Sequence, residues 1–73
     1  MIDVSVFTDE ALEGYDQMMI EASLKVDRFS ALALSIWDEV LRELDVRGKV
    51  ELISGSYEDV GNSRIRRLYS NES

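Results

Sequence analysis

The sequence contains neither cysteine nor histidine. Without cysteine the chain forms no disulfide and no thiolate metal site, and without histidine it has no imidazole for acid–base catalysis or zinc binding. It also lacks a glycine-rich phosphate loop, a G-x-S-x-G segment and a calcium-loop pattern. A chain of 73 residues leaves little room for a water-excluding catalytic pocket. We therefore expect a protein that is not an enzyme and uses no cofactor or metal ion.

Long apolar runs are absent too. No segment reaches the length of a membrane-spanning helix, and the N-terminus lacks a basic region followed by an apolar signal segment. We expect a cytoplasmic protein without a membrane role. The chain is short enough to form one domain, residues 1–73, with a small core. Since disulfides and metals are excluded, oligomerisation or docking onto a partner remains as a source of extra stability, and we expect a homodimer.

The charge is strongly acidic and unevenly distributed. The formal net charge is −7 and the pI is about 4.3. Residues 1–45 carry a net charge of −8, whereas residues 46–73 carry +1. Domains that bind nucleic acid through phosphates are normally basic, so nucleic acid is not expected as the main ligand. An acidic surface fits a basic protein surface instead, including one that itself binds nucleic acid.

Apolar spacing predicts the first half of the chain. Alternating apolar residues predict a short strand over residues 2–7. Thr8 follows as a good N-cap for a helix over residues 9–24, whose apolar residues form one clean face. Ile20 and Leu24 fall outside that face, on the polar side. They are candidates for a contact surface, unless the C-terminal segment folds over them.

A second helix is predicted over residues 28–46, with Asp27 or Ser30 as its cap. Leu34 and Leu41 widen its apolar band to about 200°. A helix with so wide a band is buried on two sides. In so short a chain, we expect another chain to cover one of them.

The last third of the chain has two possible structures. The pattern of residues 49–54 predicts a strand. Residues 60–63 resemble the turn of a hairpin, whose second strand would be "RIRRLYS". A short helix over the same return segment is the alternative. The hairpin is preferred because the apolar residues of the first strand need a strand partner. The fold class is therefore a small α+β domain of order β-α-α-β-β, with two amphipathic helices on a short antiparallel sheet. Residues 1–48 form its body, residues 49–73 form the hairpin or short helix, and the last residues are expected to fray.

The order of elements over residues 2–46 is carried by "VSVF", "TDEALEGYD" and "VDRFSAL". It resembles the ribbon-helix-helix family. The resemblance implies an intertwined dimer whose paired N-terminal strands enter the DNA major groove. Outward strand residues of that family are mostly polar or basic, but here they would be Asp3, Ser5 and Phe7. No lysine or arginine stands near Asp3 to offset its repulsion from phosphates.

Two sequence clusters are candidates for partner contact. The acids Asp9, Glu10, Glu13 and Asp16 could present a docking face, although compensation of the helix dipole accounts for the first two. The arginines of "SRIRRLYS" could bind phosphate or an acidic partner, or could balance the chain's own acids. The candidate partner-binding residues are Glu13, Asp16, Ile20, Glu21, Leu24, Leu34, Trp37, Leu41, Arg64, Arg66 and Arg67.

The function that the sequence favours is a small acidic protein-interaction module. We expect a regulator or inhibitor that binds a basic protein surface, of the kind that phages and other mobile elements often encode. The alternative is a ribbon-helix-helix-like transcriptional regulator or antitoxin that binds DNA.

Overall fold

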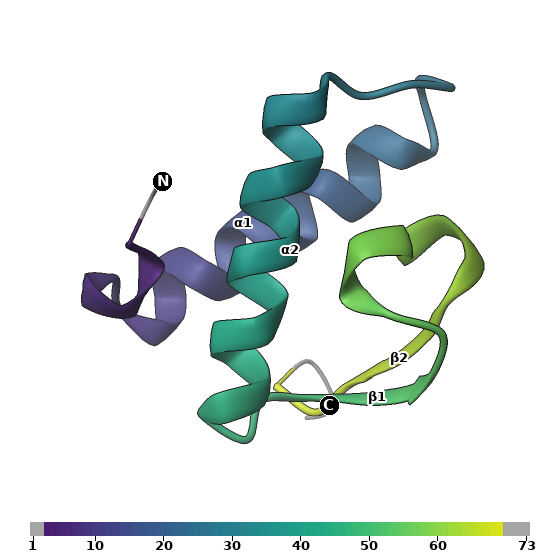
Figure 1. Ribbon diagram of the computed structural model, residues 1–73. Helices are drawn as coiled ribbons and strands as arrows, with labels where there is room; N and C mark the ends of the chain where they lie inside the picture. The colour runs from purple at the N-terminus through teal and green to yellow at the C-terminus, as the bar shows by residue number, and fades with distance from the viewer. Residues whose placement is uncertain (1–2, 70–73) are drawn as a thin grey trace.

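Two helices are followed by a two-stranded antiparallel sheet in a computed structural model that describes residues 3–69 (Figure 1). Two short 3₁₀ segments, η1 and η2, complete the order. The elements are η1 (Val4–Val6), α1 (Asp9–Ser23), α2 (Ala31–Val46), β1 (Val50–Ser54), η2 (Tyr57–Asn62) and β2 (Arg64–Arg67). The prediction of a small α+β domain with two helices and an antiparallel sheet is confirmed.

The predicted N-terminal strand is wrong. Val4–Val6 form a 3₁₀ turn, which the Asp3 carboxylate caps by accepting hydrogen bonds from the backbone N–H of Ser5 at 3.0 Å and from its hydroxyl at 2.6 Å. Val4 is buried, whereas Val6 is 74% exposed, so the alternating residues do not share a buried face. Ile2 lies outside the described residues. The strand that the ribbon-helix-helix resemblance relied on is therefore a turn between residues 3 and 7.

Both helices begin at hydroxyl caps. Thr8 Oγ1 accepts from the backbone N–H of Ala11 at 3.1 Å, and Ser30 Oγ accepts from that of Ala33 at the same distance. Such caps satisfy backbone donors that the first helical turn leaves unpaired. The first helix agrees with its prediction, whereas the second begins three residues later than predicted. Ser30, rather than Asp27, is its cap.

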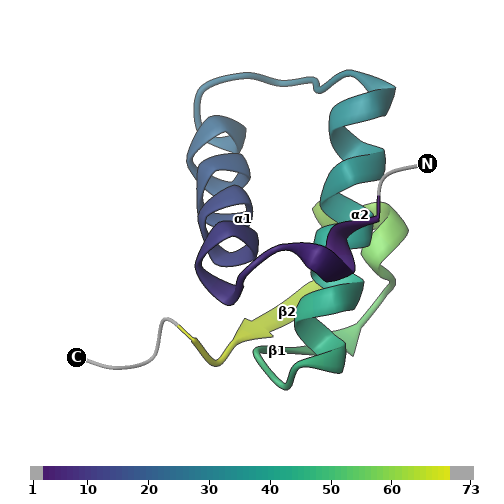
Figure 2. The ribbon, with the colours of Figure 1, turned by 90° about the vertical axis from the view of Figure 1, so that its left-hand side faces the viewer.

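The core lies where α2 meets the rest of the chain. Figure 2 shows α1 and α2 side by side, with the strands across the end of the pair. The helix α2 contacts α1, η1, β1 and η2. The chain itself therefore covers Leu41 completely, and the expectation that a second chain covers this side is wrong for that residue. Leu34 is 41% exposed. The buried apolar residues are Val4, Leu12, Met19, Trp37, Val40, Leu41, Leu44, Val50 and Tyr57.

The C-terminal segment is a hairpin, as preferred from the sequence, and β2 returns as a strand rather than a helix. Val50 pairs with Arg67 and Leu52 with Ile65, with an irregularity before Ser54. The connection is longer than the predicted four-residue turn, because η2 occupies most of it. The predicted frayed end, residues 70–73, lies outside the described residues.

Gly55 closes the base of this connection. Its φ is +90°, and a Cβ there would lie 2.3 Å from Ser63 Oγ. The Ser63 hydroxyl accepts from the backbone N–H of Ser56 at 2.8 Å and lies 2.5 Å from the Ser56 carbonyl oxygen, to which it donates. Only glycine combines this backbone conformation with so close an approach. The hydrogen bonds between Ser56 and Ser63 join the two ends of η2 where it meets the strands.

Candidate protein-interaction surface

Asp16, a predicted partner-binding acid, lies in the interior instead. It is fully buried, and its carboxylate accepts from Trp37 Nε1 at 2.9 Å, Arg67 Nε at 3.0 Å and the Tyr69 hydroxyl at 2.5 Å. A second Arg67 nitrogen lies 2.9 Å away and completes the ion pair. Gln17 donates to the Tyr69 hydroxyl at 2.9 Å. The acid therefore links α1 to α2 and β2, and its assignment to a partner surface is wrong.

The environment of Asp16 keeps it charged. Burial raises the pKa of this carboxyl, but the hydrogen bonds from Arg67, Tyr69 and Trp37 outweigh burial and hold the pKa below 3.8. Burial, together with the hydrogen bond to Asp16, raises the pKa of Tyr69. Among the described residues, every buried side-chain polar atom has a hydrogen-bond partner. The buried polar groups around Asp16 therefore all have hydrogen-bond partners within the chain.

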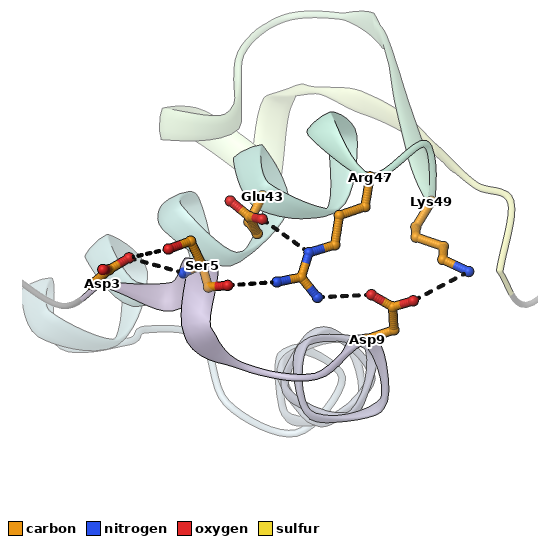
Figure 3. A network of polar contacts seen from close by, with 6 residues as sticks. All are labelled: Asp3, Ser5, Asp9, Glu43, Arg47 and Lys49. Carbon is orange, nitrogen blue, oxygen red and sulfur yellow. Dashed lines mark hydrogen bonds and ion pairs between the residues drawn. The ribbon is translucent and has the colours of Figure 1, made fainter.

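Asp9 is occupied by a second network, on the surface near the start of α1 (Figure 3). Arg47 lies 2.7 Å from the Asp9 carboxylate and 2.9 Å from that of Glu43, and it donates to the Ser5 carbonyl at 3.0 Å. Lys49 approaches the other Asp9 oxygen at 3.7 Å. The hydrogen bond from Arg47 is the main cause that lowers the pKa of Asp9. This acid is paired within the chain.

The arginine cluster of the last strand is divided by the pleat. Arg67 points inward to Asp16, whereas Arg64 and Arg66 are exposed. Arg66 lies 3.6 Å from Glu51 on the neighbouring strand. The interpretation that these arginines balance the chain's own acids therefore fits Arg66 and Arg67. The Arg67 side chain is 19% exposed and is engaged by Asp16, so its assignment to a partner surface stays a prediction.

Three further acids lie on the outer side of α1. At about 100° per residue, Glu10, Glu13, Gln17 and Glu21 fall on the side opposite Leu12. Glu10 and Glu21 are exposed and Glu13 is half-buried. Within residues 3–69, no ion pair is recorded for these three acids. We call Glu10, Glu13 and Glu21 the outer acidic face.

The predicted apolar contact residues divide into buried and exposed ones. Leu41 is fully buried and presents no side chain on the surface, whereas Trp37 is 4% exposed and reaches solvent only at the wall of a groove. Ile20 is half-buried and packs against the core, whereas Leu24 is 82% exposed. Leu34 opens onto a groove between the second half of α1, the interhelical loop, α2 and η2. Ile20 and Trp37 line the same groove.

Sequence reasoning missed the residues that hold these networks together. Tyr69 lies 53 positions from Asp16, and Arg47 lies 38 positions from Asp9, so no local spacing links them. One signal was present for Asp16. Asp16 follows Leu12 by four residues, so the two side chains point only about 40° apart around the helix axis. Leu12 is on the predicted apolar face, and Asp16 therefore lies on that face too.

Comparison with known proteins found no similar protein. A scan of family models, a search of curated proteins and a search of solved structures each found no match.

In the part of the chain that the structure describes, no helix is long and apolar enough to cross a membrane. No group of three or more acidic side chains there is arranged to hold a metal ion.

Proposed function

We propose that this chain is a small acidic interaction module, a regulator or inhibitor, that binds a basic protein surface through the outer acidic face of α1. Glu10, Glu13 and Glu21 lie along one side of a rigid helix, which fixes the spacing of their carboxylates. A basic partner would approach faster and bind more tightly because of this concentrated charge.

The observation that carries the proposal is that three acids without a recorded ion pair lie together on one side of α1, whereas others without one, such as Asp3 and Glu39, lie on other segments. Asp9, Asp16, Asp38 and Glu43 each lie within 3.0 Å of an arginine nitrogen of the chain. The three acids of the outer face have no such partner recorded among residues 3–69. Glu10 and Glu21 are exposed and Glu13 is half-buried, so at least two of these charges are open to a partner.

The test is capture with two charge-matched variants as bait. The triple variant E10Q/E13Q/E21Q removes the face, and D3N/E39Q/E51Q removes the same charge elsewhere. In an extract of the source cells, quantified by mass spectrometry, the unaltered chain should retain a basic protein. The face variant should lose at least nine-tenths of it, whereas the matched variant should retain most of it. Equal retention by both variants would contradict the proposal.

The second candidate, a DNA-binding regulator, is tested with the same proteins. The acidic-module proposal predicts no binding to duplex DNA, even at low salt. Binding that weakens steeply with salt, and less steeply after substitution of Arg64 and Arg66, would favour the regulator instead.

A further inference from the structure

The groove beside α1 is large enough to hold side chains of a partner. Its volume is about 700 Å³, and it is partly open to solvent. Ligand pockets commonly span about 300 to 1,000 Å³. Its apolar lining comes from every element around it: Ile20, Val26, Phe29, Leu34, Trp37 and Val60. Figure 1 shows η2 on the same side of the molecule as the C-terminal end of α1, and residues of both segments line the groove.

Two features of the floor and walls favour binding of apolar groups. Val26 is 48% exposed and Leu34 is 41% exposed, so both present apolar surface to solvent. Phe29 and Trp37 meet edge to face, with ring centroids 6.1 Å apart. The hydrogen bond from Trp37 to the buried Asp16 fixes the indole. These contacts hold Trp37 in place at the wall of the groove, which lowers the entropy cost of ordering this side chain on binding.

The rim is acidic. Asp27, Glu58 and Asp59 line the groove and are exposed. Two arginines line it as well, but Arg67 is engaged by Asp16, and only Arg28 is exposed there. Glu58 has one exposed contact, to an arginine nitrogen at 3.7 Å, and pairs of that kind contribute little. An apolar floor with an acidic rim is complementary to a segment that is both apolar and basic.

We propose that this groove binds a cationic amphipathic helix of the partner protein, with apolar side chains inserted and basic side chains on the rim. The inference rests on the proposed function, because it names the partner segment that the acidic module recognises. Both surfaces involve α1: Ile20 lines the groove, and Glu21 of the outer acidic face lies about 100° further around the helix.

A second copy of the chain is the less suitable occupant. Each copy carries a net charge of −7, so two acidic rims would approach each other against repulsion. A basic segment gains attraction at the same place.

The experiment uses Trp37, the only tryptophan of the chain, as a reporter inside the groove. The probe is a 14-residue amidated peptide of leucine and lysine, with leucines at helical spacing. Octalysine supplies charge without apolar groups, and a peptide with glutamate in place of lysine supplies apolar groups with the opposite charge. Affinity is measured by calorimetry, and occupation of the groove by the shift of tryptophan emission.

The leucine–lysine peptide should bind at least tenfold more tightly than octalysine and shift the emission of Trp37. The glutamate peptide should not bind. The variants L34Q and V26Q should each weaken binding of the leucine–lysine peptide at least fivefold and leave octalysine affinity unchanged. The matched control is L32Q, because Leu32 is 66% exposed on the same helix and does not line the groove. It should change neither affinity. Circular dichroism verifies that each variant is folded.

Failure of the groove and failure of the acidic face are distinguishable. Equal effects of L34Q and L32Q, or an unshifted Trp37 emission, would overturn the groove while leaving the acidic face untouched. If E10Q/E13Q/E21Q leaves octalysine affinity unchanged while L34Q still weakens the leucine–lysine peptide, the acidic face fails and the groove stands. A dimeric molar mass with Trp37 emission that changes on dilution would assign the groove to a second copy and overturn the proposal.

Discussion

Asp16 and Glu13 lie three residues apart on the same helix, yet they do different things. Asp16 is fully buried among Trp37, Arg67 and Tyr69, and it holds α1 against α2 and β2. Glu13 is half-buried at the edge of the outer acidic face, with no ion pair recorded among residues 3–69. The same residue type is a structural anchor on one side of α1 and a candidate recognition group on the other.

The difference teaches how the chain distributes its net charge. Arg47 and Arg67 both turn toward acids of the first helix, Asp9 and Asp16. The basic C-terminal segment therefore neutralises the inner side and the N-terminal end of α1. On the outer side of α1, Glu10, Glu13 and Glu21 have no ion pair recorded among residues 3–69.

The largest effect is expected from removal of the inner acid. The variant D16A leaves Arg67 and the Trp37 N–H without their buried acceptor, so we expect a loss of about 3–5 kcal/mol in the free energy of unfolding. That is most of what a domain of this size has. The control E13A should change stability by less than about 0.5 kcal/mol. Urea denaturation measures both, and equal effects would remove the contrast between the two sides.

Acid pH should act on the same group. Because the folded-state pKa of Asp16 is lowered, its contribution is present above pH 3.8 and is lost as the pH falls through the lower folded value. The unfolding free energy of the unaltered chain should therefore drop below pH 3.8. The variant D16N, which has already lost the charged form, should show a smaller drop over the same range. Urea titrations at a series of pH values measure this, and parallel curves would contradict the assignment.

Tyr69 and Tyr57 allow a comparison of two hydroxyl hydrogen bonds, each to a carboxylate. Tyr69 donates to the buried Asp16, whereas Tyr57 donates to the exposed Asp45 at 2.9 Å. We expect Y69F to cost about 1.5–3 kcal/mol and Y57F about 1 kcal/mol, because the acceptor left behind is buried only in the first case. Thermal and urea unfolding of both variants measure the order. Y57F as the more damaging change would contradict it.

The smallest effect on stability belongs to the outer face. The variant E10Q/E13Q/E21Q removes three carboxylates without an ion pair recorded in residues 3–69, so the unfolding free energy should change by no more than about 0.5 kcal/mol for each site. A loss of several kcal/mol would show that these acids are structural as well. Urea denaturation beside D16A gives the direct comparison.

The sequence predicted the parts of the fold that depend on local signals. Hydroxyl caps and apolar spacing located both helices, and the need of the first strand for a partner favoured the hairpin. The N-terminal strand failed because Asp3 caps a turn over Val4–Val6 and one valine alone is buried there. Alternation in so short a segment does not distinguish the two structures.

The candidate site was predicted only in part, because some of its contacts join residues that are far apart in the sequence. Residue type alone placed Asp16 with the other acids of the helix. Its true position depends on Arg67, 51 residues away, and no spacing rule connects them. Leu41 was expected at an interface because its helix has a wide apolar band, and η1, η2 and β1 of the same chain surround that helix instead.

The most direct test of the central claim is a map of where a basic probe binds. The backbone amides of the labelled chain are followed by NMR while octalysine is added at low salt. The account predicts the largest shifts at Glu10, Glu13, Gln17 and Glu21, with small shifts at the paired acids Asp38 and Glu43. The variant E10Q/E13Q/E21Q should lose this pattern. Shifts spread evenly over all exposed acids, or retained in that variant, would contradict the claim that the outer side of α1 is the recognition surface.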